Sequence, residues 1–153
     1  MKLTVAIDRT VGRTFYRWHV FLYRRTHGVI GHKSPVGPML LLETRGRKSG
    51  QTRSVTLLYY QKGGILYVVA SNGGRPGHPE WLLNVRAHPE VTVQVGASRF
   101  TAVAREIPSA DDPALWDELV RHYHGWADYQ LLTERTISAV ELTPTEDRAS
   151  NDR

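Results

Sequence analysis

The sequence contains no cysteine, and this absence excludes disulfide bonds, thiolate metal sites and a cysteine nucleophile anywhere in its 153 residues. It also lacks an uninterrupted apolar run near the roughly 20 residues that a membrane-spanning helix requires. The N-terminal residues are soon interrupted by charge, so they do not resemble a secretory signal. We therefore expect a cytoplasmic protein without a membrane-spanning segment.

Familiar catalytic and metal-binding motifs are missing as well. The run from Gly46 to Ser49 is not a Walker A loop, because Arg47 stands where its second glycine belongs. No G-x-G-x-x-G follows an apolar strand, and there is no G-x-S-x-G nucleophile elbow. His122 and His124 are spaced so that they do not share one face of a helix, and no H-E-x-x-H occurs. No metal site is predicted.

The charge balance is basic. Lysine and arginine, 20 residues against 15 aspartates and glutamates, give a net charge of +5. Such an excess suits an anionic small molecule, nucleic acid or an anionic membrane surface. The cations gather in one N-terminal segment and one short loop rather than along a continuous stripe. Nucleic acid is therefore the least favoured partner, and none is predicted.

The most informative stretch is residues 40–60, where two apolar runs flank a short loop. The loop and its borders carry Arg45, Arg47, Lys48 and Arg53 beside two glycines. Glycines let the backbone bend and expose its N–H groups, and the cations supply charge. The pattern fits an anion-binding cradle and fits a solvated hairpin tip about equally well. Arg45, at the end of the first run, receives no role.

Apolar periodicity, turn residues and capping signals predict the order of the elements. Helices are expected at 9–27, 78–87, 111–122 and 126–134. Strands are expected in the apolar run before the cationic loop and at 54–60, 65–71, 91–95, 100–106 and 137–142. Residues 31–38 and 71–77 are expected to be irregular loops. Tight hairpins with helices between them indicate a small antiparallel barrel in an α+β domain.

Three parts are expected along the chain: an N-terminal amphipathic helix at 1–30, a barrel domain at 31–145 and a polar tail at 146–153. One face of the helix carries Val11, Phe15, Trp18 and Leu22, and Arg13, Arg17 and Arg24 project from another. The helix either packs on its own barrel or lies at a membrane surface, since aromatic residues oppose an arginine face. Packing on the barrel is the favoured interpretation.

Aromatic residues supply the last signal. Tyr123, Trp126 and Tyr129 are spaced by threes, which places them along one side of a helix. Aromatic residues at this spacing usually pack in a core. Trp81 offers another flat surface near the glycine-rich loop at 71–77. A barrel, an anion cradle and aromatic walls together describe a site for a planar, phosphate-bearing cofactor.

Three segments in this order and spacing resemble the deazaflavin-dependent nitroreductase family. They are Arg47-Lys48-Ser49-Gly50-Gln51-Thr52-Arg53, Ser71-Asn72-Gly73-Gly74 and residues 78–91, within a likeness that spans Phe15 to Pro144. The family consists of split-β-barrel oxidoreductases that use 8-hydroxy-5-deazaflavin, coenzyme F-420. The resemblance implies a split antiparallel barrel like that of FMN-binding proteins, with flanking helices. It also implies hydride transfer from the reduced coenzyme to a quinone, enone or nitro compound.

The resemblance implies a division of labour among named residues. The coenzyme's phosphodiester and glutamate tail would be held by Arg47, Lys48, Ser49, Gly50 and Arg53. Its ring and edge would be lined by Val55, Thr56, Leu57, Ser71, Asn72, Gly73 and Gly74, with Trp81 and Asn84 fixing the short helix nearby. The acceptor pocket, and the catalytic role, would fall to Tyr123, Trp126 and Tyr129. A phenol there could donate a hydrogen bond or a proton to the acceptor.

Two alternatives stay open. The same barrel could bind FMN, because the cationic loop would serve either phosphate. A non-enzymatic binder of anionic membrane or nucleic acid rests only on the net charge. In some members of the family the N-terminal helix associates with membrane, and Phe15, Trp18 and the arginine face keep open peripheral contact with the inner face of the cell membrane as an accessory to the enzyme.

Overall fold

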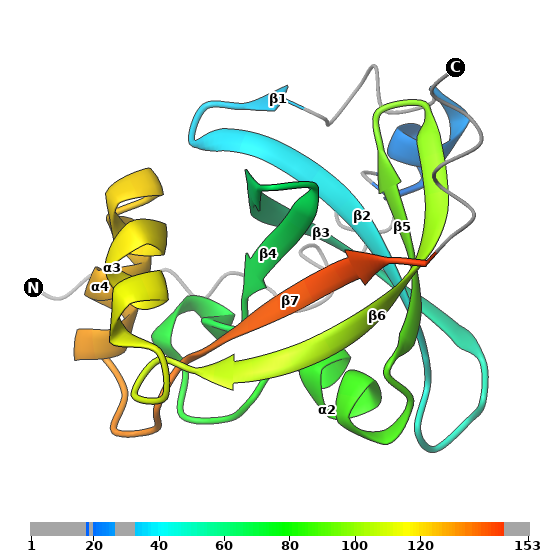
Figure 1. Cartoon of the computed structure of the whole chain (residues 1–153). Helices are drawn as coiled ribbons and strands as arrows, with labels where there is room; N and C mark the ends of the chain where they lie inside the picture. Colours follow the sequence, from blue (N-terminus) through cyan, green and yellow to red (C-terminus); the bar gives the residue numbers. More distant parts are fainter. Residues whose placement is uncertain (1–17, 19, 27–32, 146–153) are drawn as a thin grey trace, which may run out of the picture.

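Six antiparallel strands close into a barrel in the computed structural model, which describes residues 18, 20–26 and 33–145 (Figure 1). The strands are β2 (Gly37–Arg45), β3 (Thr52–Lys62), β4 (Ile65–Val69), β5 (Glu90–Val95), β6 (Ser98–Pro108) and β7 (Ser138–Pro144). Their order is β2-β3-β4-β7-β6-β5, and pairing of β2 with β5 closes the circle. The predicted split-barrel fold class is confirmed.

The connections are as tight as the turn residues predict. Gly63 and Gly64 join β3 to β4 with φ of 57° and 79°, the left-handed values that a two-residue hairpin turn requires. A shorter strand, β1 (Lys33–Ser34), pairs with the start of β2. Residues 31–38 were expected to be a loop, and the described part of that range is instead a small hairpin that leads into the barrel.

Two apolar clusters hold the domain together. The first fills the barrel, where Leu40, Leu42, Val93 and Val140 are fully buried. Helix α2 (Glu80–Ala87) packs Trp81, Leu82 and Val85 against this cluster at one end of the barrel (Figure 1).

The second cluster lies between the sheet and two helices, α3 (Pro113–His122) and α4 (Gly125–Leu131), which connect β6 to β7 (Figure 1). Asp112 caps α3 by accepting a hydrogen bond from the backbone N–H of Leu115 at 3.0 Å. The cationic loop thus lies beside α2 and the first cluster, whereas the aromatic residues at 123–129 pack with the second.

The predicted N-terminal helix is present where it is described, at residues 20–25. The helix does not contact the barrel through the predicted apolar face that includes Trp18, because Trp18 is exposed. It contacts the barrel through Tyr23, which is fully buried. The hydroxyl of Tyr23 lies 3.1 Å from the carbonyl oxygen of Met39 and 3.2 Å from that of Gln94, and it accepts from Gly96 N–H. The favoured interpretation, packing on the barrel, is confirmed for this segment, but through Tyr23.

Other boundaries differ in detail. Residues 72–74, expected to be irregular, form a single 3-10 turn, η1 (Asn72–Gly74). Helix α4 ends at Leu131 rather than at Glu134, and β7 continues to Pro144 rather than ending at Leu142. The start of the N-terminal helix and the tail at 146–153 lie outside the described residues. Among the described helices, none is long and apolar enough to cross a membrane.

Candidate functional site

A pocket of about 520 Å³ opens between the cationic loop and α2. It is lined by Thr44, Gly46, Arg47, Lys48, Ser49, Arg53, Ser54, Val55, Glu80, Trp81 and Asn84. Most of the tail-binding set predicted from the sequence is therefore brought together in one place, beside the helix that was expected to accompany it.

The loop is a folded turn rather than a loose hairpin tip. Gly46 N–H donates to Gln51 O and Gly50 N–H donates to Gly46 O, both at 2.8 Å. Gly50 adopts φ of 69°, which glycine tolerates without strain. A Cβ atom on Gly46 would lie 2.7 Å from Ser49 Oγ and 3.0 Å from Gln51 O. The glycines thus allow a tight turn that holds the flanking cations in fixed positions.

Asn84 fixes this turn to α2. Its side chain is buried, and Oδ1 accepts from the backbone N–H of Arg47 at 3.1 Å and from Arg47 Nη1 at 3.0 Å. Nδ2 donates to Thr44 Oγ1 at 3.2 Å. One amide therefore joins the helix to the last residues of β2 and to the loop that follows. The expected positioning role of Asn84 has a geometric basis.

The cations of the pocket differ in what they contact. Arg47 Nη1 also donates to Glu80 Oε2 at 2.7 Å, and this bond with the guanidinium lowers the pKa of Glu80. Arg47 was expected to present its charge to a ligand, but here it is already paired. Within the described part of the chain, Lys48 and Arg53 make no ion pair or side-chain hydrogen bond. Arg45 lies elsewhere, in a neighbouring pocket on the other side of the loop.

The apolar wall of the pocket is short. Val55 and Trp81 line it, and both also pack against the barrel interior. Thr56 and Leu57, expected along the cofactor ring, are not among the lining residues. Leu57 instead packs against the first cluster.

The glycine-rich loop at Ser71, Asn72, Gly73 and Gly74 does not line this pocket either. A Cβ atom on Gly74 would lie 2.8 Å from Leu132 Cβ, so the loop rests on the end of α4. Arg135 fixes it there by donating to Ala70 O, Ser71 O and Arg75 O at 3.2, 2.8 and 3.1 Å. Arg135 was missed in the sequence, where no motif marks it.

Tyr123 lies between α3 and α4 in extended backbone, so it does not share one helical face with Trp126 and Tyr129 as their spacing predicted. All three nevertheless join the second apolar cluster, Trp126 within it and the two tyrosines against it. Trp126 is only 3% exposed, with Tyr123 edge-on at 5.4 Å between ring centroids. Core packing, the ordinary interpretation of this spacing, is correct for Trp126. Tyr123 and Tyr129 pack at the border of the cluster, and a hydrogen bond with Tyr129, with burial, raises the pKa of Tyr123. None of the three lines the pocket, and their catalytic role stays a prediction.

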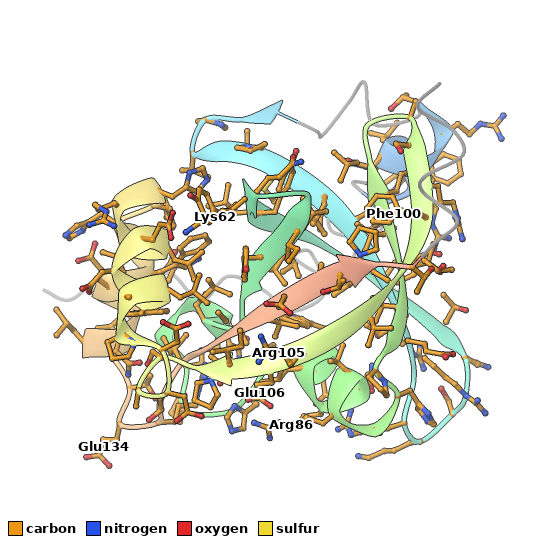
Figure 2. The ribbon with its side chains drawn as sticks, in the orientation of Figure 1. Lys62, Arg86, Phe100, Arg105, Glu106 and Glu134 are labelled. Carbon is orange, nitrogen blue, oxygen red and sulfur yellow. The ribbon has the colours of Figure 1, made fainter. Side chains whose placement is uncertain are left out.

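Helix α2 is also tied to the barrel on the side away from the loop. Arg86 donates to both carboxylate oxygens of Glu106 in β6, at 2.7 and 2.8 Å, and Figure 2 shows the two side chains directed toward each other. This pair, with a hydrogen bond from Ser138, lowers the pKa of Glu106. Two sets of polar contacts, at Asn84 and at Arg86, therefore fix the helix that forms one wall of the pocket.

No cluster able to hold a metal ion occurs among the described residues.

Known proteins are similar to this chain in sequence and in fold. The family described as "F420H(2)-dependent quinone reductase" matches residues 15–144. A relative of that name from Mycobacterium tuberculosis is 37% identical over 147 residues, covering 94% of this chain and 99% of the relative.

Solved structures of related proteins resemble this chain as well. An F420-H2 dependent reductase is 38% identical with a TM-score of 0.62, covering 69% of this chain and 93% of that chain. A domain-swapped dimer is 32% identical with a TM-score of 0.66, covering 87% and 98%. A heme storage protein of Vibrio cholerae, 16% identical with a TM-score of 0.51, covers 71% of this chain and shares the fold alone. Nearly the whole chain thus matches one group of barrel reductases, as the resemblance predicted, and the protein belongs to the F420H(2)-dependent quinone reductase family.

Proposed function

We propose that this protein is an oxidoreductase that transfers a hydride from reduced coenzyme F-420 to a quinone. The observation that carries the proposal is the pocket between the cationic loop and α2, which Lys48 and Arg53 line while making no ion pair or side-chain hydrogen bond with the described residues. Unpaired cations beside a cavity favour a ligand that brings its own negative charge. Family membership supports the nature of that ligand.

The residues present fit a phosphate-bearing cofactor. Lys48 supplies a point charge, and Arg53 supplies a planar fork that matches phosphate or carboxylate oxygens. The hydroxyl of Ser49, which accepts from Gln51 N–H at 3.2 Å, keeps its own proton for donation. When bound, the deazaflavin supplies the hydride chemistry. The chain's contribution is to hold the anionic part and to place Val55 and Trp81 against apolar surface.

The acceptor side of the proposal rests on Tyr123 and Tyr129. A phenol is protonated at neutral pH, and the raised pKa of Tyr123 keeps it so. The hydrogen bond between Tyr123 and Tyr129 uses one of their two hydroxyl protons and leaves the other for donation to an acceptor. Trp126 contributes by packing beneath them. Tyr123→Phe is expected to lower kcat for quinone reduction while leaving the dissociation constant of the coenzyme unchanged. Equal losses in both quantities would argue against a role on the acceptor side.

The test is a titration of the purified protein with oxidised coenzyme F-420, followed by tryptophan fluorescence, since Trp81 lines the pocket. We expect saturable binding that Lys48→Ala and Arg53→Ala each weaken by about tenfold, equivalent to about 1.4 kcal/mol. Arg121→Ala is the matched control, because it removes the same charge from exposed α3. Tight FMN binding without coenzyme F-420 binding would contradict the proposal, as would equal effects of all three substitutions.

We further propose peripheral membrane contact through the described part of the N-terminal helix. Trp18 and Phe21 are 58% and 50% exposed, with their rings in edge contact at 6.0 Å, and the Arg25 guanidinium lies 5.9 Å from the Phe21 ring. Aromatic rings beside cations suit an anionic bilayer surface. Trp18→Ser with Phe21→Ser is expected to reduce co-sedimentation with anionic vesicles. Truncation before residue 28 is a poorer test, because it would also remove the buried Tyr23.

A further inference from the structure

Glu80 lines the pocket and forms an ion pair with Arg47. Of the three cations that line the pocket, Arg47 is thus the one already paired. We infer that Glu80 is an intramolecular competitor: its carboxylate holds the position on Arg47 that an anionic group of the ligand takes when it binds. Glu80 would then set how much negative charge a ligand needs to enter. The inference deepens the proposed function and, for its natural ligand, rests on it.

The pair is asymmetric in a way that favours displacement of Glu80. Its side chain is 79% exposed, against 22% for Arg47, and Arg47 is its one ion-pair partner among the described residues. An exposed carboxylate regains full hydration when it leaves such a pair, so the pair contributes little to stability. Glu80 can therefore turn into solvent without leaving a buried polar group unsatisfied.

Arg47, by contrast, is held in place independently of Glu80. Asn84 Oδ1 accepts from both the backbone N–H and the Nη1 of Arg47, at 3.1 and 3.0 Å. After Glu80 leaves, the guanidinium would remain directed into the pocket with its remaining N–H groups available. A phosphate or carboxylate would then meet three cations, Arg47, Lys48 and Arg53, in a fixed arrangement.

This arrangement has a consequence for selectivity. A neutral or weakly charged ligand cannot replace the carboxylate on Arg47 without losing an ion pair. A phosphodiester or a polycarboxylate can, because it returns an equal or greater charge to the guanidinium. The ligand class that the pocket selects is thus a polyanion rather than any planar molecule of suitable size. The uncharged ring of the ligand alone would not displace Glu80 from Arg47.

The experiment measures dissociation constants for coenzyme F-420 and, separately, for inorganic pyrophosphate. The proteins are wild type, Glu80→Gln, Arg47→Ala and the double variant. Glu134→Gln is the matched control, since it removes the same charge from an exposed residue far from α2 (Figure 2). Glu80→Gln should tighten binding of both probes by about two- to fivefold, the range that follows from exposed ion pairs. Glu134→Gln should leave both constants unchanged.

The double variant separates competition from a general electrostatic effect. If Glu80 acts by occupying Arg47, Glu80→Gln should lose most of its gain when Arg47 is alanine, leaving only the weaker effect of its charge on Lys48. A gain of the same size in that background would overturn the inference, as would weaker or unchanged binding in Glu80→Gln alone. Equal melting temperatures of wild type and Glu80→Gln confirm that the fold is intact. Pyrophosphate binding without coenzyme binding would refute the proposed function and leave the competition at Arg47 testable.

Discussion

Replacing Asn84 with alanine is expected to destabilise the protein and to release the cationic loop from α2. The substitution removes three hydrogen bonds, from Arg47 N–H, from Arg47 Nη1 and to Thr44 Oγ1. At about 1 kcal/mol for each bond, the expected loss is about 3 kcal/mol, since Asn84 and Thr44 are buried and water does not replace the lost partners fully.

A loss of this size is a large share of the total, which for a domain is about 5–15 kcal/mol. For a chain of 153 residues it corresponds to a fall in Tm of about 6–12 °C. Urea unfolding followed by tryptophan fluorescence gives the free energy directly. Titration of the same variant with coenzyme F-420 should show weaker binding, because Arg47 and Lys48 are no longer held at the pocket.

Asn84→Asp is the matched control. Its carboxylate keeps an acceptor for both Arg47 bonds, and the hydroxyl of Thr44 can rotate to donate to the other oxygen. The aspartate variant should therefore unfold much closer to wild type than the alanine variant. A loss below about 1 kcal/mol for Asn84→Ala would refute the reasoning, because it is what a single hydrogen bond contributes. Equal losses for the two variants would do the same.

Three further outcomes are expected. Tyr23→Phe should cost about 1–3 kcal/mol in urea unfolding, because Gly96 N–H loses its buried acceptor, and no change would contradict the described contact. Arg135→Gln should speed amide hydrogen exchange at Ser71 and its neighbours, since it removes the donors that hold their carbonyls, while exchange in the barrel core stays constant. Burial lowers the pKa of His78 from its ordinary value of 6.5, so the folded protein binds a proton less readily than the unfolded one, and stability should fall as pH drops through 6.5 toward the lower pKa of the folded state. His78→Gln should flatten that difference between pH 7.5 and 5.5, and an unchanged slope would assign it to other groups.

Local patterns in the sequence were sufficient for the barrel. Strand alternation in β6, the glycine pair between β3 and β4, and the Asp112 cap each act within a few residues, so sequence reasoning places them well. The cationic loop and α2 were also predicted together, through the family resemblance. The elements that were missed are short: β1 pairs over two residues, and η1 is a single turn.

The partners of the site residues were harder to predict, because they depend on side-chain direction across long separations. Arg47 is 33 residues from Glu80 and 37 from Asn84, and no periodicity indicates that one arginine contacts both. Arg135 reaches back 64 residues to Ser71 from a segment without a motif. The spacing of Tyr123, Trp126 and Tyr129 favours core packing, whereas the family resemblance implies a pocket wall. That Trp126 packs in the core follows only from the positions of α3 and α4 against the sheet.

The N-terminal helix contributes to the closure of the barrel. β2 and β5 pair over three residues, from Leu41–Gln94 to Glu43–Thr92, whereas β2 and β3 pair over seven. Tyr23 contacts the backbone of both strands at this short seam, and beside it Glu43 of β2 pairs with Arg24 of the helix and Arg99 of β6. The helix therefore bridges the shortest strand pairing of the closed barrel and adds contacts that the three residue pairs there do not supply. Loss of these contacts would weaken the closure of the barrel, and it would also remove the hydrogen bond from Arg24 to Ser54, which lines the cationic pocket.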